Sequence, residues 1–162
     1  MIINVRVDGR LVHGQVAMMW APFLQIRRIM VIGDEIASDD LGKEALKLAK
    51  PSGTNLSILP VDKAIKNILN HRYDSQRVMI VTRELDALIR LKEAGVEFDE
   101  VNVGNVSNKE GKTTIYKSVF VNEEEATQFR KLNNLGVKLV HRMTPQVDAD
   151  DFMKALNDKM AE

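Results

Sequence analysis

The feature that most constrains the fold is an alternation along the chain. Short apolar runs, rich in β-branched residues, alternate with segments of helical periodicity. Short apolar runs bounded by turn residues are typical of strands that are buried on both faces of a parallel sheet. Segments with apolar residues every three or four positions are typical of helices that cover such a sheet. The alternation therefore predicts an α/β fold: a doubly wound, mostly parallel open sheet of about seven strands with helices on both faces.

The strand pattern predicts where the functional site lies. It occurs at residues 2–7, 29–32, 56–59, 78–81, 100–103 and 137–140, with one further strand expected within 115–121. In open α/β sheets, ligands bind beyond the carboxyl ends of the strands, where the strand order reverses. The loop after the first strand is therefore the first place to look for chemistry.

The clearest helix signal follows the expected strand at 115–121. Asn122 and Glu125 have the spacing of a capping box, and Gly136 is suited to end the helix. Three apolar residues between them recur on one face: Ala126, Phe129 and Leu132.

Two other helices have predicted boundaries. Residues 14–20 are expected to form a helix that stops before Pro22, because proline cannot donate a helical hydrogen bond. The Met-Met-Trp run at 18–20 is most simply core packing on that helix. Near the C-terminus, Asp148 is expected to cap a helix. The inner face of that last helix is expected to carry Phe152, Leu156 and Met160.

Length and composition exclude several classes of protein. A chain of 162 residues predicts a single domain spanning 1–162. The formal net charge is zero, so no basic field for nucleic acid is indicated. The chain has no cysteine, which excludes disulfides, thiolate catalysis and cysteine metal sites. It has neither a secretory signal nor an apolar stretch long enough to span a bilayer, so we expect a cytoplasmic protein.

The segment R-V-D-G-R-L-V-H-G-Q-V near the N-terminus carries the candidate chemistry. Asp8 and Gly9 are a turn signal, so Arg10 and His13 are expected on the connection between the first strand and the next helix. Free backbone N–H groups and the positive end of the helix dipole attract anions there. Gly14 has no side chain, so its backbone can approach a bound group closely.

These residue types suit reversible phosphoryl transfer. Arg10 offers a planar fork of donors that matches phosphate oxygens. His13 offers an imidazole nitrogen that is nucleophilic when unprotonated near neutral pH. No metal or other cofactor is required, because such catalysis is mainly positioning and electrostatics. The residues alone leave a plainer interpretation open, in which His13 caps or fills a turn and Arg10 is solvated or paired with Asp8.

The same segment resembles the active-site segment of one family. That family comprises the enzyme IIB components of the mannose/fructose/sorbose class of the bacterial phosphoenolpyruvate-dependent sugar phosphotransferase system (PTS). Its pattern is R-[IV]-D-x-R-L-[IV]-H-G-Q-V followed shortly by tryptophan, which Trp20 supplies here. An acidic residue is often found where this chain has Gly9, a departure expected to loosen the turn. The resemblance continues through most of the chain, for example at Val101-Asn102-Val103-Gly104-Asn105.

The resemblance implies a protein-Nπ-phosphohistidine–sugar phosphotransferase with a doubly wound parallel sheet. His13 is implied to be phosphorylated at Nδ1 by the partner enzyme IIA (EIIA). Arg10 is implied to serve onward transfer to a sugar held by the membrane subunits EIIC and EIID, with which the protein would associate peripherally. The residues that it implies shape or support the loop are Asp8, Gly14, Gln15 and Arg6.

Several points stay open in the sequence. The sugar itself is not readable. The resemblance implies the mannose, fructose, sorbose or N-acetylgalactosamine class, and the Val-Gly-Asn stretch favours an amino sugar. A homodimer is one alternative for the oligomeric state. His71 and His141 are expected to have solvated or structural roles. Gly104-Asn105 is expected to border the site or to form a simple turn. The competing functions are a flavodoxin-like or receiver-like binding or regulatory module, which would need a cofactor site or an activated Asp, and a structural adaptor.

Overall fold

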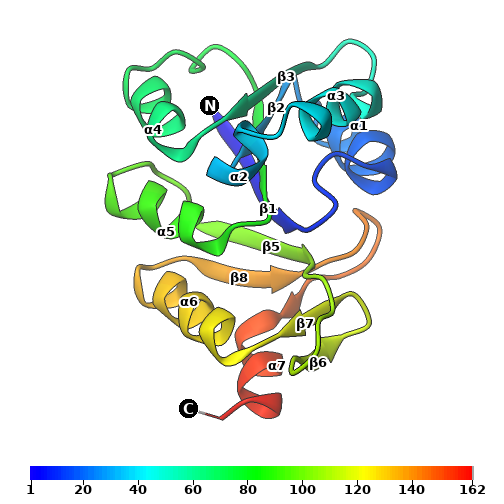
Figure 1. The fold of residues 1–162 in the computed structure, drawn as a ribbon, viewed down its shortest axis with the longest axis vertical. Coiled ribbons are helices and arrows are strands. Elements are labelled where there is room, and N and C mark those ends of the chain that lie inside the picture. Colours follow the sequence, from blue (N-terminus) through cyan, green and yellow to red (C-terminus); the bar gives the residue numbers. More distant parts are fainter. Residues whose placement is uncertain (162) are drawn as a thin grey trace.

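The computed structural model describes residues 1–161 and has the predicted α/β architecture (Figure 1). The strands are β1 (Ile2–Asp8), β2 (Arg28–Ile32), β3 (Asn55–Leu59), β4 (Val78–Thr82), β5 (Glu100–Asn105), β6 (Thr113–Tyr116), β7 (Val119–Val121), β8 (Lys138–His141) and β9 (Asp150–Asp151). The helices are η1 (Gln15–Trp20), α1 (Ala21–Phe23), α2 (Asp34–Ala37), α3 (Asp40–Ala49), α4 (Val61–Leu69), α5 (Leu85–Glu93), α6 (Glu123–Asn134) and α7 (Phe152–Lys159).

Seven strands form one sheet in the order β3-β2-β4-β1-β5-β8-β9. Every neighbouring pair in it is parallel except β8 and β9, which are antiparallel. The predicted doubly wound, mostly parallel sheet is therefore confirmed.

Apolar side chains are buried on both faces of this sheet. In β2, Met30 and Ile32 belong to one buried cluster, while Ile29 and Val31 belong to the other. The first cluster is closed by residues of α4, α5, α6 and α7, and the second by residues of η1, α1, α2 and α3. Burial on both faces explains why the strands are continuous apolar runs in the sequence and not alternating ones.

The capping box at the start of α6 is present as predicted. The Asn122 side chain accepts from the Glu125 backbone N–H at 2.8 Å, and the Glu125 carboxylate accepts from the Asn122 N–H at 3.0 Å. Such a cap stabilises a helix by about 1 kcal/mol. Gly136 follows the helix with a φ of 91°, a left-handed conformation that suits glycine.

The further strand expected within 115–121 is present as β7, but it is one arm of a hairpin and does not join the main sheet. The chain forms a hairpin there, with a turn at Lys117 and Ser118, and β6 and β7 make a separate two-stranded sheet. The turn is held because Ser118 donates its hydroxyl to the Gly104 carbonyl at 2.8 Å and its own carbonyl accepts from Val106 N–H at 2.9 Å. The seventh strand of the main sheet is instead β9, whose two aspartates carry no apolar signal.

The first helix also differs from its prediction. It begins as a π-helix, η1, and continues past Pro22 as α1. Pro22 lies in the first turn of α1, at the change of helix type, where a missing N–H costs little. The helix therefore ends three residues later than expected, at Phe23.

The predicted cap of the last helix is wrong as well. Asp151, and not Asp148, accepts the Lys154 backbone N–H, at 3.2 Å. The extended pairing of β9 with β8 continues to Asp151, so the helix can begin only after it. The inner face predicted for this helix is buried as expected: Phe152, Leu156 and Met160.

Candidate functional site

The loop after β1 lies at the switch point of the sheet (Figure 1). Strand β1 is central, between β4 and β5. The connection that follows β1 packs on one face through η1, whereas α5, which follows β4, packs on the other. The two connections therefore diverge beyond the carboxyl end of β1, which is the place where such sheets bind ligands.

The backbone of this loop is tightly held. Leu11 has a φ of 58°, an unfavourable conformation for leucine, and its side chain is fully buried. Gly9 N–H donates to the Asn105 carbonyl at 3.0 Å. A Cβ atom at Gly9 would lie 2.8 Å from the Ser107 hydroxyl oxygen and 3.0 Å from Oδ1 of Asn105. Gly9 is therefore part of a closely packed turn and not the loosened one expected from the family pattern.

Three side chains converge on the carboxylate of Asp8, which is fully buried at the end of β1. Its Oδ2 lies 2.8 Å from Nε2 of His13 and 3.1 Å from Nε of Arg6. Arg10 donates to it twice, from Nε to Oδ1 and from Nη2 to Oδ2, each at 3.1 Å. The pairing of Arg10 with Asp8, one of the plainer alternatives, is thus present. It is also what links Arg10 to His13.

The surroundings of Asp8 keep its carboxyl ionised. Burial by itself would raise the pKa of this group, but the hydrogen bonds of His13 and Arg10 and the charge of Arg6 outweigh it and hold the pKa well below its usual range. An ionised carboxylate can only accept hydrogen bonds, so Nε2 of His13 is the donor. The lone pair of the neutral ring is therefore on Nδ1, where the Gln15 backbone N–H lies 3.3 Å away.

The two arginines differ in exposure. The side chain of Arg10 is 42% exposed, whereas that of Arg6 is completely buried. Burial lowers the pKa of Arg6, and the neighbouring Asp8 partly restores it. Both guanidinium groups donate from Nη2 to Oε1 of Gln15, at 3.4 Å from Arg6 and 3.2 Å from Arg10. The His13 side chain is 15% exposed, so part of it can be reached by a partner.

The side chains at 18–20 are divided between core and surface. Trp20 is buried, as predicted, and donates its indole N–H to the Met143 carbonyl at 3.0 Å. Met18 and Met19 are not core residues, since Met18 is 76% exposed. The widened turn of η1 is one reason, because the 3.6-residue period that predicts the buried face does not hold in a π-helix.

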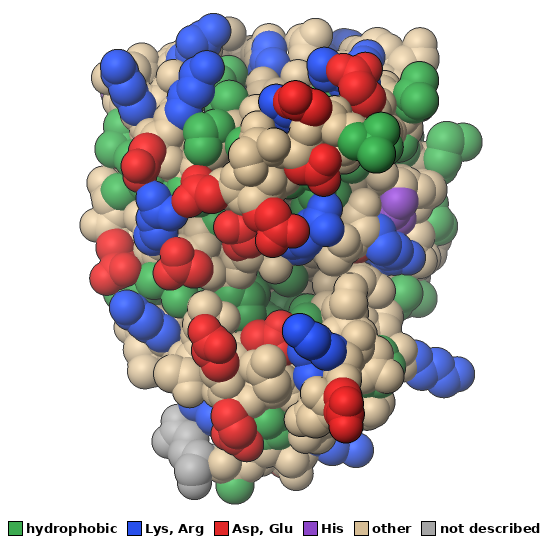
Figure 2. All heavy atoms as spheres, in the orientation of Figure 1, with side chains coloured by type: hydrophobic (Ala, Val, Ile, Leu, Met, Phe, Trp, Pro, Cys, Tyr) green, Lys and Arg blue, Asp and Glu red, His purple; other side chains and the backbone are tan. Residues whose placement is uncertain are grey.

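Figure 2 shows hydrophobic side chains protruding at the upper right, over α1 and α3. The exposed apolar residues here include Met18 of η1, Phe23 of α1, and Leu41 and Leu48 of α3.

The other two histidines, His71 and His141, make their hydrogen bonds with residues outside this loop. His71 is exposed, and its ring lies 2.8 Å from a carboxylate oxygen of Asp74. His141 is buried at the end of β8, where Nδ1 lies 2.6 Å from the Val103 carbonyl and the ring stacks on Tyr116 at 3.8 Å. Burial lowers the pKa of His141. Both placements fit the solvated and structural roles expected of them.

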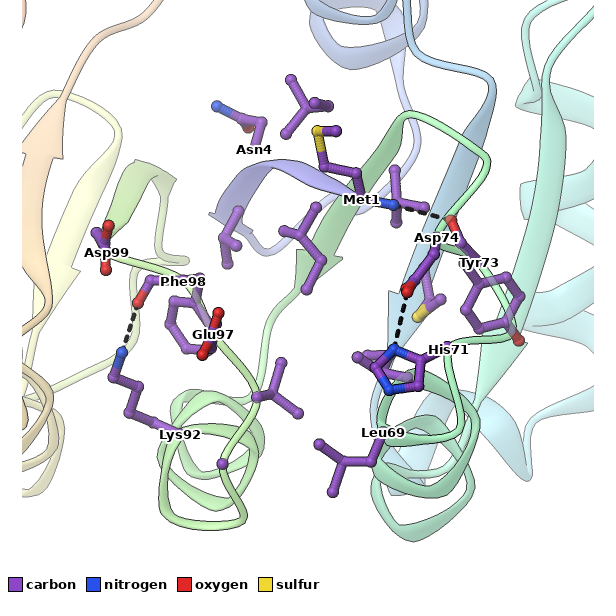
Figure 3. Close-up of a pocket in the computed structure, with 18 of the residues that line it drawn as sticks. Met1, Asn4, Leu69, His71, Tyr73, Asp74, Lys92, Glu97, Phe98 and Asp99 are labelled. Carbon is purple, nitrogen blue, oxygen red and sulfur yellow. Dashed lines mark hydrogen bonds and ion pairs between the residues drawn. The ribbon is translucent and has the colours of Figure 1, made fainter.

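A large hollow lies at the other end of the sheet (Figure 3). It has a volume of about 1080 Å³ and is formed by the first residues of β1 and by segments next to α4 and α5. Its polar groups are partly paired with one another, as in the contacts of His71 with Asp74 and of Lys92 with the Phe98 carbonyl. None of residues 6–15 lines it, so the candidate site is recognised by its chemistry and not by its concavity.

Comparison with known proteins decides the family. A family model described as "PTS system sorbose subfamily IIB component" matches residues 2–162. The chain belongs to this family. The predicted membership of the mannose/fructose/sorbose class of IIB components is therefore confirmed, and the flavodoxin-like or receiver-like alternative is set aside.

Individual relatives agree along the whole chain. The IIB chain is 33% identical over 159 residues to the sorbose-specific EIIB component of Lacticaseibacillus casei, covering 98% of this chain and 97% of that protein. It is 35% identical over 158 residues to the mannose-specific EIIAB component of Escherichia coli K12, covering 97% of this chain but 48% of that longer protein. The IIBSor domain of the sorbose permease of Klebsiella pneumoniae superposes with a TM-score of 0.94 at 25% identity, covering 100% of this chain and 99% of that one.

Two further findings bear on this IIB component. Among residues 1–161, no group of three or more His, Asp or Glu side chains is placed to hold a metal ion. Within the same part of the chain, none of the helices has the length and apolar character needed to cross a bilayer.

The sequence missed three features of the site. It did not predict that Asp8 is the point where both arginines and His13 meet, because hydrogen bonds among loop side chains leave no periodic signal. It gave no role to Ser107, which lies over Gly9. It placed Gly104 only at the border of the site, although this glycine contacts Arg6 directly.

Proposed function

We propose that this IIB component accepts a phosphoryl group from EIIA on Nδ1 of His13 and transfers it to a sugar held by EIIC and EIID. The observation that carries the proposal is the 2.8 Å contact between Asp8 and Nε2 of His13. It holds the hydrogen on Nε2 and leaves the lone pair on Nδ1, the nitrogen that can attack phosphorus.

In the loading step, the Nδ1 lone pair attacks the phosphorus and the bond from phosphorus to the donor breaks. Positive charge develops on the imidazole as the new N–P bond forms, and the Asp8 carboxylate beside Nε2 stabilises it. The Gln15 N–H donates to Nδ1 in the unloaded protein at 3.3 Å, and once Nδ1 is bonded to phosphorus this amide and others at the start of η1 can receive the phosphoryl oxygens.

In the transfer step, a sugar hydroxyl oxygen attacks the phosphorus, the N–P bond breaks and the hydroxyl proton is released. The ring returns to its neutral form with the hydrogen on Nε2. Arg10 can assist here because its side chain is partly exposed and its Nη1 makes no hydrogen bond within the described residues. Rotation away from Asp8 would place its planar fork on the phosphoryl oxygens. Arg6 is buried and stays with Asp8, so the carboxylate keeps a cationic partner while Arg10 moves.

The surface beside the loop suits transient partners. Met18 and Phe23 are exposed on the helix that directly follows His13. Flexible methionine side chains adapt to more than one partner surface, which a carrier between EIIA and the membrane subunits requires. Contact with EIIC and EIID would place this component at the membrane surface.

The sugar is proposed only as a class. Relatives are named for sorbose, mannose, fructose and N-acetylgalactosamine. The hydroxyl that accepts the phosphoryl group is held by the membrane subunits, so these four sugars form the panel for an uptake assay.

A phosphorylation assay tests the proposal. The protein is mixed with phosphoenolpyruvate, the general phosphocarrier proteins and EIIA, and the acid-labile phosphate is mapped by mass spectrometry. We expect phosphate on His13, none in His13→Ala, and normal loading in the matched His71→Ala control. Phosphate on another residue, or none with an active donor set, would reject the proposal.

A further inference from the structure

We infer that Gly104 is a positioning residue for phosphoryl transfer, because only a glycine there leaves room for Arg6 to hold Asp8 against His13. The inference rests on the proposed function of His13. It extends that function to a strand other than the one that carries the catalytic loop.

The space beside Gly104 is filled by the Arg6 guanidinium. A Cβ atom at position 104 would lie 2.2 Å from Nη2, 2.4 Å from Cζ and 2.8 Å from Nε of Arg6. These separations are far inside van der Waals contact. The backbone does not require glycine there, since Gly104 lies in β5 and is not among the residues with a positive φ. Space for Arg6 is therefore the reason for a glycine.

Arg6 has no other place to go. Its Nε donates to Asp8 at 3.1 Å and its Nη2 donates to Gln15 at 3.4 Å. The Trp20 ring lies 5.8 Å from its Cζ atom, and the side chain is fully buried. A methyl group at 104 must therefore displace the guanidinium from its bonds.

Strand β5 is not free to retreat either. The Gly104 carbonyl accepts the hydroxyl of Ser118 at 2.8 Å, which ties this point of the strand to the hairpin turn. On the other side, the neighbouring residue Val103 is fully buried and pairs in register with Val7 of β1. The strand is thus held from two directions, and the strain of an added methyl falls on Arg6.

The burial of Arg6 is costly in itself, which argues against a purely stabilising role. Its Nη1 is buried with no hydrogen-bond acceptor among the described residues. Apolar side chains commonly fill such positions with equal or better stability. Arg6 provides a fixed cation that an apolar residue cannot. Its guanidinium bonds Oδ2 of Asp8, the same oxygen that accepts the hydrogen bond of His13.

The consequence of a side chain at 104 follows from this chain of contacts. Displacement of Arg6 removes a donor from Oδ2 of Asp8, so the carboxylate can turn toward Arg10. The hydrogen bond to Nε2 of His13 then weakens, and the ring is less firmly oriented for attack at Nδ1.

The experiment compares Gly104→Ala with Val103→Ala, a matched loss of packing in the same strand that leaves Arg6 alone. The first readout is the NMR signal of the Nε2–H proton of His13, which a strong hydrogen bond protects from exchange. We expect Gly104→Ala to lose this signal and to slow His13 loading by about tenfold or more. Val103→Ala should keep the signal and a rate within about twofold of the wild type.

The double variant Arg6→Lys/Gly104→Ala decides whether the effect passes through Arg6. Lysine lacks the planar group that fills the space, so in the Arg6→Lys background the alanine should add less than about twofold. Additive losses would overturn the inference, as would a Gly104→Ala protein with the wild-type signal and rate. If Gly104→Ala does not fold, the double variant should fold, and its failure to do so rejects the inference.

The NMR readout needs no phosphoryl donor. A wild-type protein that shows the Nε2–H signal but takes up no phosphate would therefore reject the proposed function and leave the positioning role of Gly104 to be decided by its variants.

Discussion

Replacement of Asp8 by asparagine isolates the contribution of one charge. Asp8→Asn keeps the size of the side chain but puts an amide N–H₂ where one oxygen was. Both oxygens now face donors from Arg6, Arg10 and His13, so the amide nitrogen must meet a donor in either orientation. The variant therefore loses both the charge and a consistent set of hydrogen bonds.

The size of the effect follows from the distance. With Nε2 and Oδ2 at 2.8 Å, the centres of the ring charge and the carboxylate charge are about 4 Å apart, and full unit charges at an effective dielectric of about 20 interact by about 4 kcal/mol. Only part of that charge develops in the transition state, so about 2 to 4 kcal/mol is lost, which slows transfer by about 30- to 1000-fold.

The variant is also less stable, because Arg6 is left buried without its counterion. Breaking such a pair costs about 3 to 5 kcal/mol. For a chain of this length that lowers the melting temperature by about 6 to 20 °C, which leaves a folded protein at 25 °C.

The assay is single-turnover loading of His13 from phosphorylated EIIA, with folding checked by melting. Asp34→Asn is the matched control, since it removes a carboxylate that pairs with Arg90 on the surface. A folded Asp8→Asn protein that loads at the wild-type rate would refute the role given to Asp8.

Three other changes test separate parts of the account. Arg10→Ala should slow sugar phosphorylation at least about tenfold more than it slows His13 loading, because the Arg10 clamp matters most as the phosphoryl group departs. Equal losses in the two steps would contradict this role for Arg10. Met18→Asp should weaken docking to EIIA or to the membrane subunits, measured as a raised KM for that partner at an unchanged melting temperature. An unchanged KM for EIIA and for the membrane subunits would show that Met18 is not part of the docking surface. His141→Gln should reduce the amount of folding stability that is lost as the pH falls from about 7.5 to 5.5. Since burial lowers the folded-state pKa of His141, the unfolded chain binds the proton first as the pH falls below about 6.5, and the wild type loses stability there; parallel pH profiles of melting temperature would contradict it.

Much of the fold could be predicted because strands buried on both faces leave continuous apolar runs. The six runs outside 115–121 are all strands of the main sheet. The hairpin was missed because its turn at Lys117-Ser118 interrupts the apolar pattern without a glycine or proline. Strand β9 was missed because its pairing depends on the backbone of β8 and not on its own side chains.

The candidate loop was predictable for a different reason. A histidine, an arginine and a glycine between a strand and a helix are residue types that phosphate chemistry requires, and their position follows from the strand pattern. The arrangement around Asp8 was not predictable, because it depends on the tertiary packing that buries Arg6. The contact of Gly104 with Arg6 joins residues 98 positions apart in the sequence, and no local pattern marks it.

The most direct test of the account is the position of the phosphoryl group on the His13 ring. Phosphorus and nitrogen NMR of the loaded, ¹⁵N-labelled protein distinguishes the two nitrogens by their couplings. The account predicts an N–P bond at Nδ1 with the hydrogen retained on Nε2 beside Asp8. An N–P bond at Nε2 would contradict it, because that nitrogen could not then donate to the carboxylate.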